Sequence, residues 1–168
     1  MKTKNIIIFK SDRELIKIIN NIFERFNKNK IDIALTGGNS WKNLYPKLFK
    51  QNVLKRKYNY YLTDERYTES KSLQNFFFLK KIFKNKIKIQ KFYSFRSIKK
   101  SLFNYKKVLP KKMDVVFSSM GIDGHVYSWF NVDKVWIKKN KVSFVNKKSL
   151  QIGGRLTLNK NYVNKSRI

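Results

Sequence analysis

The chain has 168 residues, 42% of them hydrophobic and 15% aromatic, which is enough for the core of one domain and excludes a disordered tail. It contains no cysteine, which excludes disulfides and thiolate metal sites and fits a reducing, cytoplasmic compartment. Its formal net charge is +29. No segment approaches the roughly 20 apolar residues of a membrane span, and the first apolar run is too short for a signal peptide.

Short runs of β-branched and aromatic residues predict strands, in chain order at Asn5–Phe9, Ile31–Thr36, Tyr58–Thr63, 86–93, 113–119, 142–146 and 155–158. Apolar residues at helical spacing predict helices at 12–26, 41–49, 73–83 and 97–106. Ser11 and Glu14 have the spacing of a capping box at the start of the first helix.

Strands that alternate with helices indicate parallel βαβ units, because a parallel strand is reached only by a crossover connection. No linker, repeat or low-complexity block divides the chain. We therefore expect a single α/β domain over residues 1–168, with a mainly parallel, twisted sheet and helices on both faces, as in Rossmann-like folds.

Three predicted strands end in polar or glycine-rich segments: "TGGNS", "TDER" and "SSMGIDGH". Ligands of open α/β sheets bind beyond the carboxyl ends of the strands, so these segments are expected to meet at one edge. The residues "DERYTESKS" are expected to form a polar loop.

The segment "TGGNS" places two glycines between a strand and a helix. Glycine lets backbone N–H groups approach an oxyanion, and a helix N-terminus adds a favourable partial charge. The alternative is a tight turn in which Asn39 or Ser40 caps the helix.

The segment "TDER" contains Arg66, whose planar guanidinium can donate two hydrogen bonds to a phosphate or carboxylate. The alternative is a solvated surface loop.

His125 is the only histidine of the chain. An unperturbed imidazole has a pKa of about 6.5 and suits proton transfer near neutral pH, although a single histidine is more often structural. A metal site is disfavoured because the sequence offers no further histidine or cysteine. A serine triad is disfavoured because "SSMG" lacks the G-x-S-x-G pattern.

The high positive charge invites a nucleic-acid partner. However, the lysines are spread along the whole chain together with Asn, Ile, Phe and Tyr, the residues that AT-rich codons specify. The sequence also lacks an arginine-rich arm, a zinc-finger spacing and an RNP-type aromatic motif. We therefore assign the charge to composition and do not expect a nucleic-acid partner.

These segments, in this order, resemble the 6-phosphogluconolactonase family, which shares its fold with glucosamine-6-phosphate isomerase. The resemblance lies in "LTGGNSWKNLYPKL", in "TDERYTESKSLQNFFF", where Asn75 conforms and Phe76 replaces a tyrosine, in "SMGIDGHVYSWF" and in "RLTL". The chain departs from the family at Thr36 and Ser119, and it lacks the prolines that are common after D-E-R. The family also continues with a strand and a helix that carry a phosphate-binding lysine. The resemblance therefore implies a sugar-phosphate-binding domain without the family's last strand and helix.

The resemblance implies hydrolysis of 6-phospho-D-glucono-1,5-lactone to 6-phosphogluconate. The deaminase branch carries a glutamate shortly after the histidine, whereas Val126–Val132 contain no acid, and "SWF" is similar to the lactonase "SLF". Three alternatives remain: a deaminase-like sugar-phosphate isomerase, an inactive paralogue that binds sugar phosphate, and a basic nucleic-acid-binding protein. Oligomeric state is left open.

The resemblance implies that His125 takes a proton from water, and that Asp123 orients its imidazole or shapes its loop. Arg66 binds the substrate or the developing oxyanion, and Asp64 contacts a sugar hydroxyl. The phosphate is held by Thr36, Gly37, Gly38, Asn39 and Arg155. No metal or cofactor is implied, because a lactone is already an activated ester.

Overall fold

A four-stranded parallel sheet forms the centre of the fold in the computed structural model, which describes residues 7–92, 97–130, 137–146 and 153–168. The strand order is β4-β2-β1-β5, with β1 at Asp32–Leu35, β2 at Asn59–Leu62, β4 at Ile89–Gln90 and β5 at Val115–Val116. β1 pairs in parallel with both β2 and β5. Three of the four residues of β1 and of β2 are buried, as expected for strands covered on both faces.

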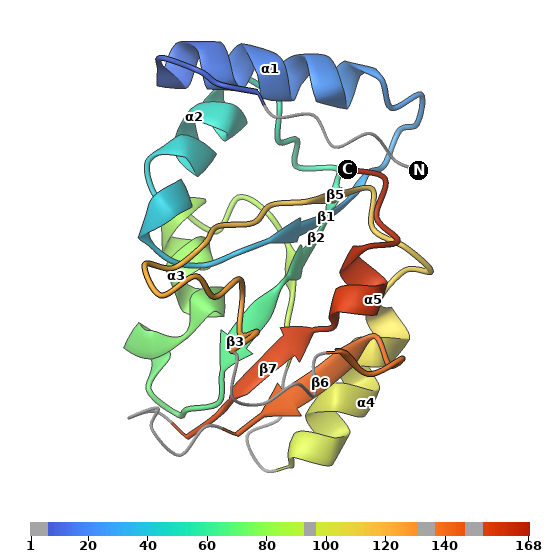
Figure 1. The fold of residues 1–168 in the computed structure, drawn as a ribbon. Helices are drawn as coiled ribbons and strands as arrows, with labels where there is room; N and C mark the ends of the chain where they lie inside the picture. Colours follow the sequence, from blue (N-terminus) through green and yellow to red (C-terminus); the bar gives the residue numbers. More distant parts are fainter. Residues whose placement is uncertain (1–6, 93–96, 131–136, 147–152) are drawn as a thin grey trace.

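Helices cover both faces of this sheet, so the predicted α/β architecture is confirmed. In Figure 1, α1 (Asp12–Glu24) and α2 (Leu44–Lys50) lie on one side, and α4 (Ile98–Val108) and α5 (Lys160–Val163) lie on the other. The remaining helices are α3 (Asn75–Ile82) and the short 3-10 helices η1 (Asn39–Trp41) and η2 (Lys71–Leu73).

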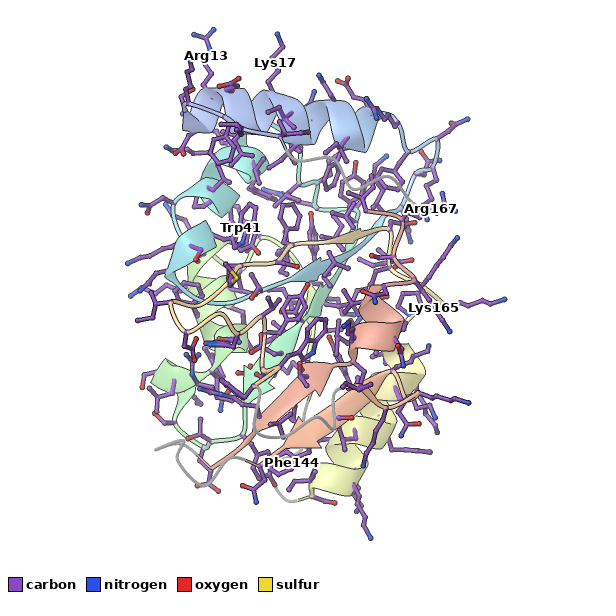
Figure 2. All side chains as sticks on the ribbon, in the orientation of Figure 1. Arg13, Lys17, Trp41, Phe144, Lys165 and Arg167 are labelled. Carbon is purple, nitrogen blue, oxygen red and sulfur yellow. The ribbon has the colours of Figure 1, made fainter. Side chains whose placement is uncertain are left out.

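The start of α1 follows from its sequence. The Ser11 hydroxyl accepts a hydrogen bond from the Glu14 amide (3.3 Å). The Glu14 carboxylate accepts one from the Lys10 amide (2.8 Å), whereas in a capping box it would accept one from the Ser11 amide. Arg13 and Lys17 point away from the body of the protein in Figure 2. The opposite face of α1 buries Ile16, Ile19 and Phe23, so the helix is held by its apolar face.

A buried tyrosine ties α4 to the central sheet. The Tyr105 hydroxyl accepts a hydrogen bond from the Leu62 amide (2.7 Å) and donates one to the Leu62 carbonyl (2.8 Å). Phe92 stacks on the Tyr105 ring with a centroid separation of 3.7 Å. Tyr105 therefore fixes the end of β2, immediately before the segment "TDER".

A second, antiparallel sheet corrects one prediction. Asp64–Arg66, expected in a polar loop, form strand β3, which pairs with β7 (Arg155–Leu158), and β7 pairs with β6 (Val142–Val145). The pairing uses backbone groups, which charged side chains do not block, and it needs a partner strand that lies far along the chain. The strands predicted at 142–146 and 155–158 are confirmed, but the sequence pattern does not indicate their antiparallel pairing.

Three further predictions differ from the structure. Ile7–Phe9 adopt no regular secondary structure, and the rest of the strand predicted at Asn5–Phe9 lies outside the described residues. The helix predicted from residue 41 is η1 followed by α2, which places Pro46 in a first turn, where its missing N–H is tolerated. Neither Asn39 nor Ser40 caps a helix through its side chain.

Candidate active site

The three polar segments meet in one pocket of about 170 Å³ at the carboxyl edge of the central sheet, where β7 also contributes. The predicted site residues that line it are Thr36, Gly37, Gly38, Asp64, Arg66, His125 and Arg155. Two others, Asn39 and Asp123, are exposed and do not line the pocket. Asn39 begins η1, and Asp123 reaches the site only through its neighbour His125.

The histidine loop is closed by short-range contacts. His125 Nδ1 bonds to the Asp123 carboxylate, and the Gly121 amide donates to the His125 carbonyl (2.8 Å). A Cβ on Gly121 would lie 2.6 Å from His125 Cε1 and 2.8 Å from Asp123 Oδ1, so a side chain at this position would displace the paired His125 and Asp123 side chains. The hydrogen bond from His125 holds the pKa of Asp123 below its ordinary value.

This geometry selects a tautomer for the neutral imidazole. With Nδ1–H donated to the carboxylate of Asp123, the lone pair is on Nε2. The ring lies 4.8 Å from the Phe130 ring, measured between centroids, and one third of the side chain remains accessible to solvent. The bond from Nδ1 to Asp123 thus orients the His125 ring and leaves Nε2 able to act as a base.

Asn75 joins Arg66 to the glycine segment. Its side-chain oxygen accepts a hydrogen bond from Arg66 Nη1 (2.7 Å), which also donates to the Leu73 carbonyl (3.1 Å). A Cβ on Gly37 would lie only 2.3 Å from Asn75 Oδ1. Glycine at this position therefore lets the "TGGNS" backbone pack against the Asn75 side chain, which in turn holds Arg66.

Asp64 is buried and holds the segments of the site together. Its carboxylate accepts hydrogen bonds from Thr63 Oγ1 (3.1 Å), Ser128 Oγ (2.8 Å) and Asn75 Nδ2 (3.3 Å). These bonds link β3, the histidine loop and the start of α3. The side chain predicted to contact a sugar hydroxyl therefore already serves as an internal acceptor.

Glu65 does not line the pocket and instead organises the first turn of α3. Its carboxylate accepts hydrogen bonds from the backbone amides of Arg66 (2.7 Å), Asn75 (2.7 Å) and Phe76 (2.8 Å). Burial raises the pKa of Glu65 to about 7, while these three amides oppose that rise. Glu65 is therefore a structural residue beside the site.

Arg155 and Arg66 are paired directly across β7 and β3, so two cations border the pocket side by side. Arg155 Nη1 is buried and has no hydrogen-bond partner among the residues that the structure describes. Burial, and next the charge of Arg66, lower the pKa of Arg155. A buried donor without a partner is unfavourable, so this corner suits an anionic ligand group.

The structure weakens one expectation about the phosphate. The glycines are followed by the three-residue helix η1 rather than by an α-helix, so no extended helix dipole points at the pocket from this segment. The backbone amides of this segment and the two arginines are the remaining groups in the pocket that can donate hydrogen bonds to an anion.

Sequence reasoning assigned no role in the pocket to several of its lining residues, which are Ser40, Asn75, Ser119, Met120, Gly121, Tyr127 and Phe130. Asn75 was visible as part of a motif, but its contact with Arg66 was not. Tyr127 gave no signal, because an aromatic residue after a glycine-rich loop is indistinguishable from a core residue.

Over the described part of the chain, no three histidine, cysteine or acidic side chains cluster as metal ligands would. Within the same residues, no helix has the length and apolar character needed to cross a membrane.

Comparison with known proteins identifies the family. Residues 10–168 match the profile of the family described as glucosamine-6-phosphate isomerases/6-phosphogluconolactonase. The chain belongs to this family. No curated protein sequence matches it significantly.

Solved structures of the family share the fold. The 6-phosphogluconolactonase of Thermotoga maritima superimposes with a TM-score of 0.75 at 25% identity, over 88% of this chain and 72% of that one. A 6-phosphogluconolactonase from Shewanella baltica OS155 gives a TM-score of 0.78 at 19% identity, over 92% of this chain and 72% of that one. A monomeric glucosamine-6-phosphate deaminase superimposes with a TM-score of 0.68 at 13% identity, over 94% of this chain and 77% of the deaminase chain.

Proposed function

We propose that the chain hydrolyses 6-phospho-D-glucono-1,5-lactone to 6-phosphogluconate. The observation that carries the proposal is the pocket in which His125, oriented by Asp123, shares the lining with Arg66 and Arg155. A base can activate water for attack on a lactone, and cations can bind an anionic substrate and its developing oxyanion. The family and its similarity to 6-phosphogluconolactonase structures support the same reading.

In this mechanism, His125 Nε2 takes a proton from water as the water oxygen attacks the C1 carbonyl. The carbonyl becomes an oxyanion, which Arg66 stabilises. When the C1–O bond to the ring oxygen breaks, the imidazolium returns its proton to that oxygen. The product is the open-chain acid, and the enzyme regains its starting protonation state.

Arg155 and the backbone of Thr36–Asn39 hold the phosphate group. The unpartnered Nη1 of Arg155 gains a charged acceptor there, and the phosphate offsets the repulsion between the two arginines. Asp123 acts by keeping the proton of the imidazole on Nδ1, so that Nε2 is the basic atom.

The direct test is lactone hydrolysis by the purified chain. The lactone is generated in situ, its disappearance is followed at fixed pH, and the spontaneous rate is subtracted. The proposal requires a rate above background that His125→Asn lowers roughly 10²- to 10⁴-fold. Ammonia release from glucosamine 6-phosphate without lactone hydrolysis would instead assign the chain to the deaminase activity. Binding of 6-phosphogluconate without either reaction would identify a sugar-phosphate-binding protein.

A further inference from the structure

Tyr127 has an unusual backbone for a bulky residue. Its φ is +54°, in the left-handed region that aromatic side chains rarely adopt. Among the described residues, the other non-glycine positions with positive φ are Asn52, Lys84 and Asn85, which follow the ends of α2 and α3, where such a conformation is common. Tyr127 follows no helix and lies two residues after His125.

Strained residues persist only where their surroundings hold them, and Tyr127 is held firmly. Its side chain is 6% exposed, and its hydroxyl contacts the Ser118 hydroxyl just beyond the end of β5. Its ring meets the Trp129 ring edge-on, at a centroid distance of 4.9 Å. Burial raises the pKa of Tyr127 to about 12, so the hydroxyl keeps its proton at neutral pH.

Tyr127 and the two residues after it attach the histidine loop to three different parts of the fold. Tyr127 reaches Ser118, Ser128 Oγ donates to Asp64 Oδ2 of β3 (2.8 Å), and Trp129 Nε1 donates to the Leu158 carbonyl of β7 (2.7 Å). The first contact ties the end of the loop back to its beginning, because Ser118 stands where β5 enters the loop.

Ser118 also connects the histidine loop to the glycine segment. Its carbonyl accepts a hydrogen bond from Trp41 Nε1 (3.1 Å) in η1. Trp41 in turn stacks on Tyr45 of α2, at a centroid distance of 5.5 Å. Displacement of Ser118 would therefore disturb both walls of the pocket.

We propose that Tyr127 is a positioning residue for His125, which it serves by fixing the exit of the histidine loop to Ser118. The inference rests on the proposed lactonase reaction for its kinetic effect, but the position of the imidazole can be measured without it. Tyr127 acts through the backbone, because it is separated from His125 only by Val126, which bridges both Met120 and Trp129.

Two variants remove the same contact from opposite sides: Tyr127→Phe keeps the ring and loses the hydroxyl, and Ser118→Ala loses the other partner. Each should lower kcat by roughly 3- to 10-fold, the range of one hydrogen bond, with KM little changed. If both act through their contact, the double variant should be no slower than the slower single variant. Tyr162→Phe is the matched control, since it removes a tyrosine hydroxyl that donates to the Pro110 carbonyl (2.9 Å), outside the lining of the pocket. It should lower stability and leave kcat unchanged.

The imidazole of His125 provides a readout independent of activity. As the only histidine, it gives one set of ring signals in ¹⁵N-edited NMR spectra. Tyr127→Phe should shift or broaden these signals, and Tyr162→Phe should not. Unchanged ring signals together with unchanged kcat in Tyr127→Phe, or fully additive effects in the double variant, would overturn the proposal. If the wild-type chain hydrolyses no lactone, the proposed function fails, and the imidazole spectra alone decide the role of Tyr127.

Discussion

Arg66 and Arg155 lie directly opposite each other in the antiparallel register of β3 and β7, so two guanidinium groups border one pocket. Such a pair is unfavourable in the free protein, because both charges are of one sign and Arg155 is partly buried. It becomes favourable when an anion lies between them. In the proposed function this anion is the phosphate of the substrate, so the pair lowers the stability of the empty site and raises its affinity for the ligand.

Arg155→Met should separate these two effects. Loss of charged hydrogen bonds to the phosphate should raise KM roughly 10- to 100-fold, with a smaller change in kcat, because the phosphate contacts persist in the transition state. The ligand-free variant should unfold at a higher temperature than the wild type, since the repulsion is removed. Arg13→Met, on the exposed face of α1, is the control and should change neither quantity. An Arg155→Met protein with unchanged KM would remove Arg155 from substrate binding.

His125→Asn should affect the chemical step. Asparagine keeps some hydrogen bonding but cannot accept the proton, so kcat should fall roughly 10²- to 10⁴-fold. KM should change less, because His125 makes no contact with the phosphate in the proposed mechanism. Asp123→Asn should lower kcat by a smaller factor, since Asp123 orients the ring from an exposed position. Initial rates above the spontaneous hydrolysis of the lactone test both variants, and an unchanged kcat in His125→Asn would contradict the mechanism.

Glu65 should make stability depend on pH. Its pKa of about 7 in the folded protein lies above the ordinary value of 4.5, so between these values the folded state binds the proton more tightly than the unfolded chain. The stabilising contribution is fully present below about pH 4.5 and is lost as the pH rises through about 7. Relative to Glu65→Gln, which cannot titrate, the wild-type free energy of unfolding should fall by up to about 3 kcal/mol across this window. Urea unfolding of both proteins between pH 4.5 and 8 measures the difference, and parallel pH profiles would show that the three amides keep the carboxylate ionised throughout.

The positive charge should give only weak binding to RNA. A lysine surface without a groove-reading motif supports non-specific affinities of roughly 10⁻⁴ to 10⁻⁶ M at physiological salt. If the positive charge reflects only the amino-acid composition, the place of a lysine should not matter. Reversing the charge of three lysines should then weaken RNA binding by the same factor at either of two separate places. The triples are Lys55, Lys57 and Lys86, which line a basic groove between α2 and α3, and Lys99, Lys100 and Lys106 of α4. Filter binding over a salt series tests this. Nanomolar, sequence-selective binding, or its loss in one triple alone, would assign the charge a function.

The parallel sheet and its helices were predictable from local patterns. Apolar spacing from Leu15 to Phe26 specifies an amphipathic helix, and the runs at Ile31–Thr36 and Tyr58–Thr63 specify buried strands. Alternation of the two element types leaves few topologies, because parallel neighbours need crossover connections. The place of the pocket follows from the same rule, since the carboxyl ends of parallel strands share one edge. His125, Arg66 and the glycines could therefore be named before the structure was known.

The contacts inside the site were decided by the tertiary structure. The sequence "TDER" reads as a surface loop, and it becomes a strand only because β7, which lies far along the chain, supplies hydrogen bonds to its backbone. That pairing sets Arg155 against Arg66 and buries Glu65. Likewise, Ser118 contacts the hydroxyl of Tyr127 and Trp129 packs against its ring, and these contacts hold its strained backbone. Local sequence carries the propensity of each segment, whereas the pairing of distant segments determines which charges and hydroxyls meet, because burial and hydrogen-bond partners exist only in the assembled fold.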